Sequence, residues 1–267
     1  MIAAGCDVGS LSAEAVILED DEIKAAEIIR VRPRAEQSAR EVMDLALSKL
    51  KLSYEDIDYI VSTGYGRETI PFSDHNISEI SCHGKGAFFL APGIRTVIDI
   101  GGQDCKAIRV DEYGGLEDFV MNDKCAAGTG RSLELMSQYL GVDFSELSGL
   151  ARQAEQPLTI TSQCSIFSEL EIMHYLMEDK NPADIAAGIC ESMARRVKML
   201  AGRVGVKPEI TITGGVCKNA AVVSYLEHML DIEFVPLTED PQIIGALGAA
   251  VFAGERCRRL KKKARTA

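Results

Sequence analysis

The sequence predicts an α/β protein built from two related halves. A shift of 92 residues lays Asp7-Val8-Gly9 on Asp99-Ile100-Gly101, and a shift of 150 residues lays the segment 60–64 on the segment 210–214. Helical periodicity follows the strand pattern of each half. Strands followed by alternating helices and strands, present twice, indicate two α/β lobes around a cleft.

The predicted elements occur in the same order in each half. An apolar strand leads into a turn containing Asp-x-Gly, and a second and a third strand follow, which describes a β-meander. These strands cover residues 2–6, 15–18 and 22–31 in the first half, and 95–100, 107–110 and 116–121 in the second. Helices are expected over residues 35–51, 81–90, 130–140, 165–177, 182–204, 220–230 and 241–253.

The repeat also gives a domain organisation. The first lobe is expected over residues 1–92 and the second over residues 93–255, with a basic C-terminal tail over residues 256–267. The segment 122–181 has no counterpart in the first half and is interpreted as an insertion that carries a specialised function. The tail holds seven basic residues and no acidic one between positions 256 and 265. Such a tail could bind an anionic partner, but it is more typical of a solvated, frayed end.

Composition excludes several classes of protein. With 267 residues and 46% hydrophobic composition, the chain can bury a substantial core. Without the tail it carries 22 basic and 40 acidic residues, a net charge of -18, which argues against a nucleic-acid partner. No apolar run reaches the roughly 18 residues of a membrane span, and the N-terminus lacks a signal-peptide pattern. We therefore expect a cytoplasmic protein with no membrane contact.

The eight cysteines are too far apart for common cysteine motifs. They occupy positions 6, 82, 105, 125, 164, 190, 217 and 257, so no CxxC zinc knuckle or thioredoxin motif exists. Cys125 and Cys164 each precede a predicted helix inside the insertion, where free N–H groups favour a thiolate or an anionic cluster. Two thiolates cannot complete a 4Fe-4S cluster, although a symmetric dimer would supply four. Spacing alone leaves open that both are unligated core thiols.

Three glycine-containing turns indicate a nucleotide site. GCDVGS, IDIGGQDCK and TITGGVCKN each follow a strand, and their backbone N–H groups suit phosphates or a nucleoside. The expected nucleotide contacts are Gly9, Ser10, Leu11, Ser12, Gly101, Gly102, Gln103, Gly214, Gly215, Lys218 and Gln242. Asp7 and Asp99 are candidate Mg²⁺ ligands, and Gln103 or Asp104 could orient or deprotonate the attacking water. The chain contains no Walker A sequence, which excludes a P-loop enzyme.

The joint order of these turns resembles the actin, sugar-kinase and heat-shock-chaperone ATPase superfamily. More specifically, DVGS, VSTGYGR, ISEISCHGKGA, IDIGGQD, MNDKCAAGTGR, SQCSIFSELE, GGVCKN and PQIIGALGAA are similar to segments of the ATPase activators of 2-hydroxyacyl-CoA dehydratases. The related ATPase subunits of benzoyl-CoA reductases are similar too. The resemblance spans about residues 1–253.

This resemblance implies an ATP-hydrolysing electron donor. It implies a homodimer that binds ATP or ADP with Mg²⁺ and holds one 4Fe-4S cluster through Cys125 and Cys164 of each subunit. The electron would come from a ferredoxin or flavodoxin and pass to an iron-sulfur 2-hydroxyacyl-CoA dehydratase or a related reductase. The alternatives are a sugar kinase-like phosphotransferase without a cluster, and a nucleotide-dependent regulator without redox chemistry.

The first phosphate turn departs from the family pattern. Leu11 and Glu14 stand where family members usually carry threonine and lysine. A glutamate there would repel phosphate unless Mg²⁺ or a base such as Lys106 intervenes. The phosphate contact from this turn is therefore in question.

Overall fold

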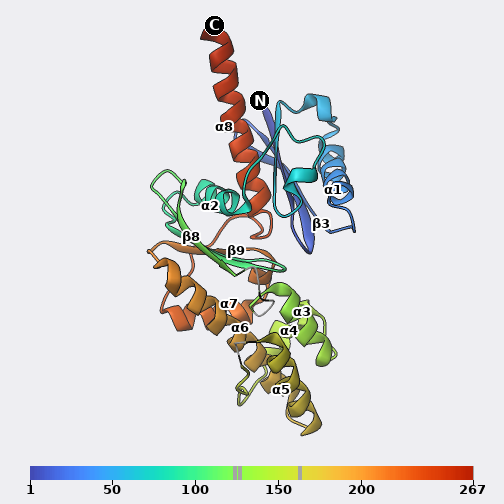
Figure 1. Ribbon diagram of the computed structural model, residues 1–267, viewed down its shortest axis with the longest axis vertical. Helices are drawn as coiled ribbons and strands as arrows, with labels where there is room; N and C mark the ends of the chain where they lie inside the picture. Colours follow the sequence, from blue (N-terminus) through green and yellow to red (C-terminus); the bar gives the residue numbers. More distant parts are fainter. Residues whose placement is uncertain (123–124, 126–127, 162–163, 267) are drawn as a thin grey trace.

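The computed structural model describes residues 1–122, 125, 128–161 and 164–266. Figure 1 shows an elongated molecule with two sheets, a long C-terminal helix at one end and a group of helices at the other. None of the described helices combines the length and the apolar composition that crossing a membrane requires.

The first sheet has five strands in the order β3-β2-β1-β4-β5. The strands are β1 (Ile2–Val8), β2 (Ser12–Glu19), β3 (Glu22–Arg30), β4 (Tyr59–Thr63) and β5 (His75–Asn76). β1 to β3 form the predicted antiparallel meander, and β4 runs parallel to β1. Helix α1 (Ala35–Leu50) packs on this sheet through buried Val42, Met43 and Leu47, which recur at helical spacing.

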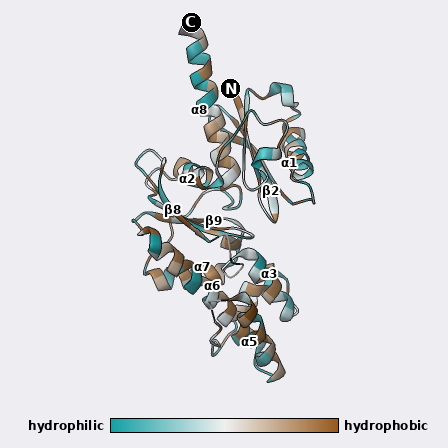
Figure 2. Cartoon of the chain, in the orientation of Figure 1, coloured by the Kyte–Doolittle hydropathy of each residue, from teal (hydrophilic) through white to brown (hydrophobic). Residues whose placement is uncertain are grey.

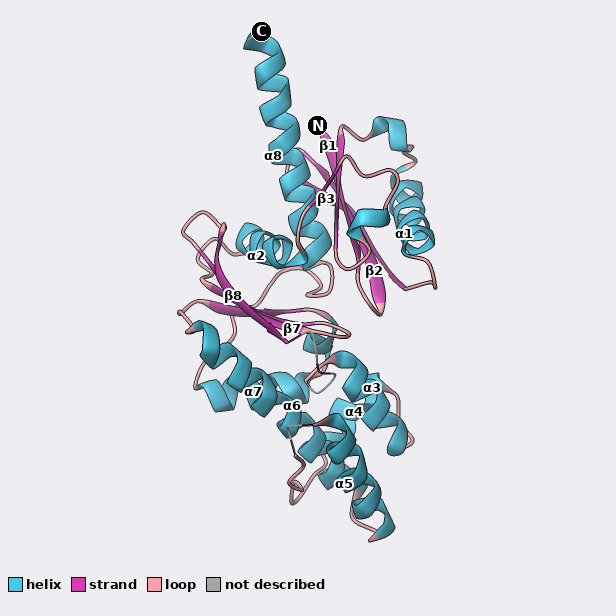
Figure 3. Ribbon diagram, viewed as in Figure 1, coloured by secondary structure: helices cyan, strands magenta, loops and turns pink. Residues whose placement is uncertain are grey.

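The second sheet repeats this design in the order β8-β7-β6-β9. Its strands are β6 (Thr96–Ile100), β7 (Cys105–Val110), β8 (Leu116–Asn122) and β9 (Ile210–Thr213). β6 to β8 form the second meander, and β9 runs parallel to β6. This sheet is the magenta group labelled β7 and β8 in Figure 3. Helices α6 (Pro182–Val204) and α7 (Ala220–Leu230) share the core of this lobe. The predicted duplication is confirmed for the three meander strands and the parallel strand of each half, whereas β5 has no counterpart among the described strands of the second sheet.

The two helices that join the lobes are far apart in the sequence. Helix α2 (Glu79–Leu90) contacts the second sheet, and helix α8 (Ile244–Thr266) packs on α2 and on β1, β2 and β4 of the first sheet. Small buried residues such as Ala246, Ala249 and Ala250 let α8 lie close to these strands. The end of the chain thus returns to the lobe in which the chain began.

The basic tail is not the frayed end that its composition suggests. Helix α8 continues through it, and Arg258 pairs with Asp21 at 2.8 Å while Lys261 pairs with Asp58 at 2.6 Å. The physical reason is that arginine, lysine, leucine and alanine are good helix formers, so nothing in this segment ends a helix that the sheet has already fixed.

The insertion forms a small helical group at the far end of the second lobe. It contains α3 (Gly130–Tyr139), α4 (Phe144–Ala151) and α5 (Ser165–Met177). Helix α4 was not predicted, because eight residues carry little periodicity. Its local signal is a capping box, in which the Asp143 N–H donates to Glu146 Oε2 over 2.9 Å. Three short 3₁₀ helices, Tyr54–Asp56, Arg67–Thr69 and Gly215–Lys218, complete the described elements.

Candidate functional site

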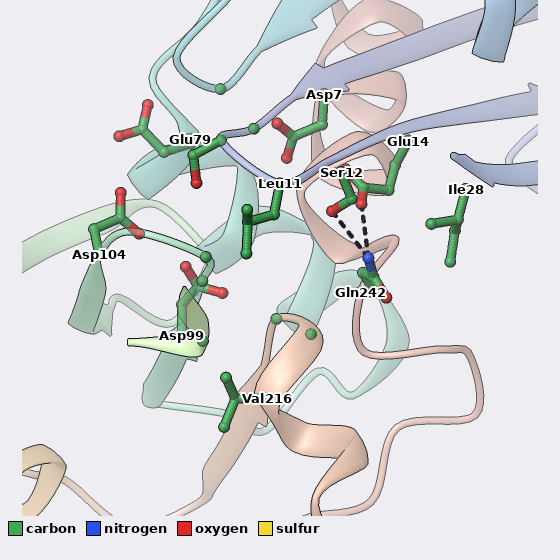
Figure 4. Close-up of a pocket in the computed structure, with 18 of the residues that line it drawn as sticks. Asp7, Leu11, Ser12, Glu14, Ile28, Glu79, Asp99, Asp104, Val216 and Gln242 are labelled. Atoms are coloured by element: carbon green, nitrogen blue, oxygen red, sulfur yellow. Dashed lines mark hydrogen bonds between the residues drawn. The ribbon is translucent and has the colours of Figure 1, made fainter. Parts of the chain in front are cut away.

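A cavity of about 370 Å³ lies between the two lobes. All three predicted glycine turns reach it (Figure 4). Of the predicted residues it brings together Asp7, Gly9, Ser10, Leu11, Ser12, Asp99, Gly101, Gly102, Asp104, Gly214, Gly215, Lys218 and Gln242. Gln103, by contrast, is exposed and does not line the cavity in the described part of the chain.

The two lobes contribute matching residues to the cavity, as the sequence repeat predicts. Asp7 at the end of β1 lies beside Thr63 of β4, and Asp99 near the end of β6 lies beside Thr213 of β9. A glycine follows each threonine with a positive φ, 82° at Gly64 and 90° at Gly214. A Cβ atom at either glycine would overlap the neighbouring aspartate, so these turns require glycine. The duplicated fold thereby aims one carboxylate from each lobe into one space.

His83 of α2 lies between these two carboxylates. Its Nδ1 atom is 3.3 Å from Asp99 Oδ1 and 3.1 Å from Thr213 Oγ1, and its Nε2 atom is 4.0 Å from Asp7 Oδ2. The imidazole ring is buried, and it lies between the two aspartates. It therefore sets the relative positions of the two carboxylates across the lobe boundary.

Lys106 holds the second phosphate turn. Its Nζ atom lies 3.3 Å from Asp99 Oδ2 and 2.5 Å from Asp104 Oδ1, and all three side chains are buried. Burial alone would lower the pKa of Lys106, but Asp99 and Asp104 together raise it. Burial alone would raise the pKa of Asp99, but the interactions with His83 and Lys106 and the hydrogen bond from Thr213 outweigh it and lower that pKa.

Tyr65 lies near Asp104 in the cavity. Burial, followed by the charge of Asp104, raises the pKa of the Tyr65 phenol to about 12. The phenol therefore stays protonated. Tyr65 of the first lobe and Lys106 of the second thus both lie beside Asp104.

The first phosphate turn contains a second, differently balanced group of acids. Glu14 is buried, and Gln242 Nε2 donates to Glu14 Oε1 over 3.1 Å and to Ser12 Oγ over 2.9 Å (Figure 4). Burial, followed by the charge of Asp7, raises the pKa of Glu14 well above its usual range. Burial also raises the pKa of Asp7 to about 6. Both carboxyl groups are therefore easier to protonate than ordinary acids.

Carboxylates outnumber cations around this cavity. Asp7, Glu14, Asp99 and Asp104 line it, whereas Lys106 is already shared between two of them. A polyphosphate would be repelled here unless a divalent cation accompanied it, because unpaired like charges in a buried site are costly. Magnesium prefers oxygen ligands from one or two carboxylates, and Asp7 and Asp99 offer them. The donor set therefore fits a hydrated Mg²⁺ bound together with the phosphates.

The two candidate cluster ligands lie outside this cavity, in the insertion. Cys125 follows β8, and Asn122 Nδ2 donates to its carbonyl oxygen over 3.1 Å. Cys164 immediately precedes α5, and its carbonyl oxygen accepts a hydrogen bond from Ser168 Oγ over 3.0 Å. Both thiols are half-buried, unlike Cys6, Cys82, Cys105 and Cys190, which are buried.

Helix α6 packs near the described residues that flank both cysteines. Gly128, three positions after Cys125, and Ser168 of α5 line one small cavity together with Ser192 and Arg196 of α6. Ser192 Oγ also donates to Thr161 O, three positions before Cys164, over 3.0 Å. In the described part of the chain, no three Cys, His, Asp or Glu side chains are grouped to hold a metal.

Several cavity residues were not predicted. Arg30, Tyr65, His83 and Glu134 line the cavity, and Lys106 was considered only as a neighbouring base. Tyr65 and His83 stand within VSTGYGR and ISEISCHGKGA, which were recognised as family segments without assigned roles. Arg30 and Glu134 carry no local signal, because they meet only after the lobes pack.

Comparisons with known proteins agree with this geometry. The sequence model of the BadF/BadG/BcrA/BcrD ATPase family matches residues 4–253. The chain is 45% identical to the activator of lactoyl-CoA dehydratase of Anaerotignum propionicum over 256 residues, which are 96% of this chain and 98% of that protein.

Solved structures extend the comparison to the fold. The activator of the 2-hydroxyisocaproyl-CoA dehydratase from Clostridium difficile, solved with bound ADPNP, is 40% identical, with a TM-score of 0.93 and coverage of 98% of both chains. A ROK family glucokinase from Streptomyces griseus, with 14% identity and a TM-score of 0.55 over 96% of this chain and all of that chain, shares the fold alone. The predicted actin and sugar-kinase type of fold is confirmed.

Proposed function

Because this chain belongs to the BadF/BadG/BcrA/BcrD ATPase family, we propose that it is the ATP-hydrolysing activator of a 2-hydroxyacyl-CoA dehydratase or a related reductase. In this function it passes one low-potential electron at a time to its partner from a 4Fe-4S cluster. Relatives named as dehydratase activators support the proposal.

One observation carries the coupling between ATP and the cluster. The backbone N–H groups of Gly130 and Arg131 donate to the carbonyl oxygens of Gly101 and Gly102 over 2.9 and 2.8 Å. Gly101 and Gly102 form the second phosphate turn, whereas Gly130 begins the helix that follows the Cys125 loop. A change in the phosphate turn is therefore transmitted through backbone hydrogen bonds to the segment that bears Cys125.

The nucleotide chemistry belongs to the cleft between the lobes. We assign Mg²⁺ to Asp7 and Asp99, and the positioning or deprotonation of the attacking water to Asp104, with Gln103 reaching the site only if its turn moves. Glycine turns from both lobes would hold the phosphates and the nucleoside.

The cluster requires two copies of this chain. Cys125 and Cys164 are the half-buried thiols of the insertion, and a cubane needs four thiolates, so each subunit of a homodimer would supply two. When bound, the cluster supplies reversible one-electron storage. Next to Cys164, helix α5 exposes Ile166, Phe167 and Leu170, which are 63%, 61% and 53% accessible. Figure 2 shows helix α5 at the far end of the molecule with much of its length coloured brown. The exposed apolar side chains suit burial against a second subunit.

The electron would enter from a ferredoxin or a flavodoxin and leave to an iron-sulfur dehydratase or reductase. The acyl-CoA substrate then belongs to that partner. The cavity of this chain is lined by carboxylates and glycine turns, which fits a metal-bound polyphosphate.

Anaerobic purification tests the proposal. We expect a brown, oxygen-sensitive protein with about four iron atoms per dimer. Its reduced form should give a spin-resonance signal that changes between ATP and ADP. Iron near four atoms per monomer, or none after anaerobic reconstitution, would overturn the cluster assignment, and ATP-dependent phosphorylation of a sugar would identify a phosphotransferase instead.

A further inference from the structure

An ion pair between the first lobe and helix α3 lies at the nucleotide cavity. Arg30 Nη1 and Nη2 donate to Glu134 Oε1 and Oε2 over 3.1 and 3.2 Å, and both residues line the cavity. We propose that Arg30 and Glu134 form an interlobe latch through which closure of the cleft moves helix α3 and thereby the Cys125 loop. Its consequence for the cluster rests on the function proposed above.

The two residues come from separate lobes. Arg30 ends β3, the edge strand of the first sheet, and Glu134 lies in the second turn of α3 in the insertion. The fork of two parallel N–H···O bonds fixes orientation as well as distance. Opening of the cleft would therefore have to break this pair or pull α3 along with the first lobe.

The pair is too exposed to serve mainly as a static support. The side chain of Arg30 is 65% accessible and that of Glu134 is 21% accessible. Exposed ion pairs contribute little stability, so breaking one changes an equilibrium by about fivefold at most. A weak contact of this kind can open and re-form as the nucleotide changes.

The N-terminus of helix α3 is also held in place. Gly130 and Arg131, one turn before Glu134, are hydrogen-bonded to the second phosphate turn, and Arg131 Nη1 lies 3.5 Å from Glu134 Oε2. A Cβ atom on Gly130 would lie 3.1 Å from Gly101 O and 3.2 Å from Val216 Cγ2, so the helix start sits tightly between two nucleotide turns. Helix α3 therefore contacts the first lobe through Glu134 and the second phosphate turn through its N-terminus.

This arrangement makes the start of α3 a pivot. Gly130 and Glu134 lie on the same short helix, so a displacement at Glu134 is passed along α3 to Gly130. Cys125 is five positions before Gly130. Glu134 and Arg30 are then positioning residues for the cluster ligand, and neither contacts the reacting atoms.

The test compares latch variants with a matched pair. Arg32 donates from Nε and Nη2 to Glu41 over 2.8 and 2.7 Å, an equally forked pair that lies within the first lobe. We would make Arg30→Ala, Glu134→Ala and their double variant, the charge swap Arg30→Glu with Glu134→Arg, and Arg32→Ala as the control.

Two rates are measured with each nucleotide. The first is the rate of Cys125 alkylation in cluster-free protein with MgATP or MgADP, resolved by mass spectrometry. The second is the rate of iron removal by a chelator from the reconstituted dimer with the same nucleotides. We expect the ATP-to-ADP rate ratio to differ from one in the unaltered protein and in Arg32→Ala. In Arg30→Ala and in Glu134→Ala we expect the ratio to move toward one, by a factor of up to about five. The double variant should be no worse than either single variant, and the charge swap should restore part of the ratio.

The outcomes separate this inference from the function on which it rests. A protein that never takes up iron refutes the cluster, while the alkylation rates still decide the latch. Latch variants that keep the full ratio, an unaltered protein whose ratio is one, or an Arg32→Ala variant that loses the ratio equally would each overturn the latch.

Discussion

The Nζ atom of Lys106 lies 2.5 Å from Asp104 Oδ1 inside the cleft, where the two side chains are 3% and 5% exposed. The same ammonium group lies 3.3 Å from Asp99. One positive charge therefore fixes both the carboxylate that we propose activates water and a carboxylate that we propose binds magnesium. Both proposed functions therefore depend on one buried cation that lines the cavity.

Replacement of Lys106 should destabilise the whole protein. In Lys106→Met two buried carboxylates lose their shared cation, and breaking a buried pair in this way costs about 3 to 5 kcal/mol. Urea unfolding measures the loss. Lys207 pairs with Glu117 at the surface, so Lys207→Met should cost no more than about 1 kcal/mol. Equal losses in the two variants would contradict the role of Lys106.

Asp104 and Gln103 should differ in their effect on ATP hydrolysis. Asp104→Asn removes a buried carboxylate that faces the cavity, so ATP turnover should fall by roughly 10² to 10⁴. Electron delivery to the partner should fall with it, while the reduced cluster stays intact. Gln103 is exposed in this structure, so Gln103→Ala should have a smaller effect unless the turn rearranges with nucleotide bound. A larger effect from Gln103→Ala would show that such a rearrangement occurs.

The raised pKa of Asp7 predicts a specific dependence of stability on pH. Its pKa is about 6 in the folded state and 3.8 as a model value, so the folded state binds more protons between these values. Stability from this group therefore falls as pH rises from about 4 to about 6. Asparagine does not titrate, so Asp7→Asn should gain roughly 1 to 3 kcal/mol relative to the unaltered protein across that window, measured by urea unfolding without nucleotide.

Asp58 supplies a control of opposite sign. The hydrogen bond from Lys261 lowers the pKa of Asp58, so its contribution to stability is present above its unfolded pKa and is lost as pH falls. Asp58→Asn should therefore lose stability relative to the unaltered protein as pH rises. The same direction for both variants would show that the shift at Asp7 is not the cause.

Glu14 should make nucleotide binding sensitive to pH. Its raised pKa means that the buried carboxyl group is readily protonated, and a protonated group does not repel phosphate. Glutamine imitates this neutral form and keeps an acceptor for Gln242. Glu14→Gln should bind MgATP more tightly than the unaltered protein by a factor that grows with pH, on the order of tenfold once Glu14 ionises. Calorimetry at several pH values checks this, and a constant ratio would refute it.

The cysteine ligands can be separated from the core thiols by substitution. Cys125→Ser and Cys164→Ser should each abolish iron binding, because each removes two of the four thiolates of the dimer. Cys190 is buried, with a thiol pKa raised to about 12, and Cys190→Ser should keep its iron. Iron content and absorbance after reconstitution give the answer. Iron retained by both ligand variants would show that other groups hold it.

The sequence by itself determined the repeated strand order, the three glycine turns, the family and the helices of the second lobe other than the short helix α4. These features depend on residues close together in the chain: strand and helix periodicities, and glycines where a backbone must turn beside a carboxylate. The ends of α6 were predicted to the residue, because Asn181 and Pro182 mark its start and Gly205 marks its end. The ends of α5 and α7 were also predicted to the residue, from their apolar periodicity.

Only the tertiary structure decided how the lobes meet. The return of α8 to the first sheet, His83 between Asp7 and Asp99, Tyr65 beside Asp104, and the pair of Arg30 and Glu134 all join residues far apart in sequence. The exposure of Gln103 and the burial of Glu14 were likewise settled by packing. The physical reason is that contacts between lobes depend on the shape and charge of two folded surfaces, and neither surface exists until its own sheet and helices have formed.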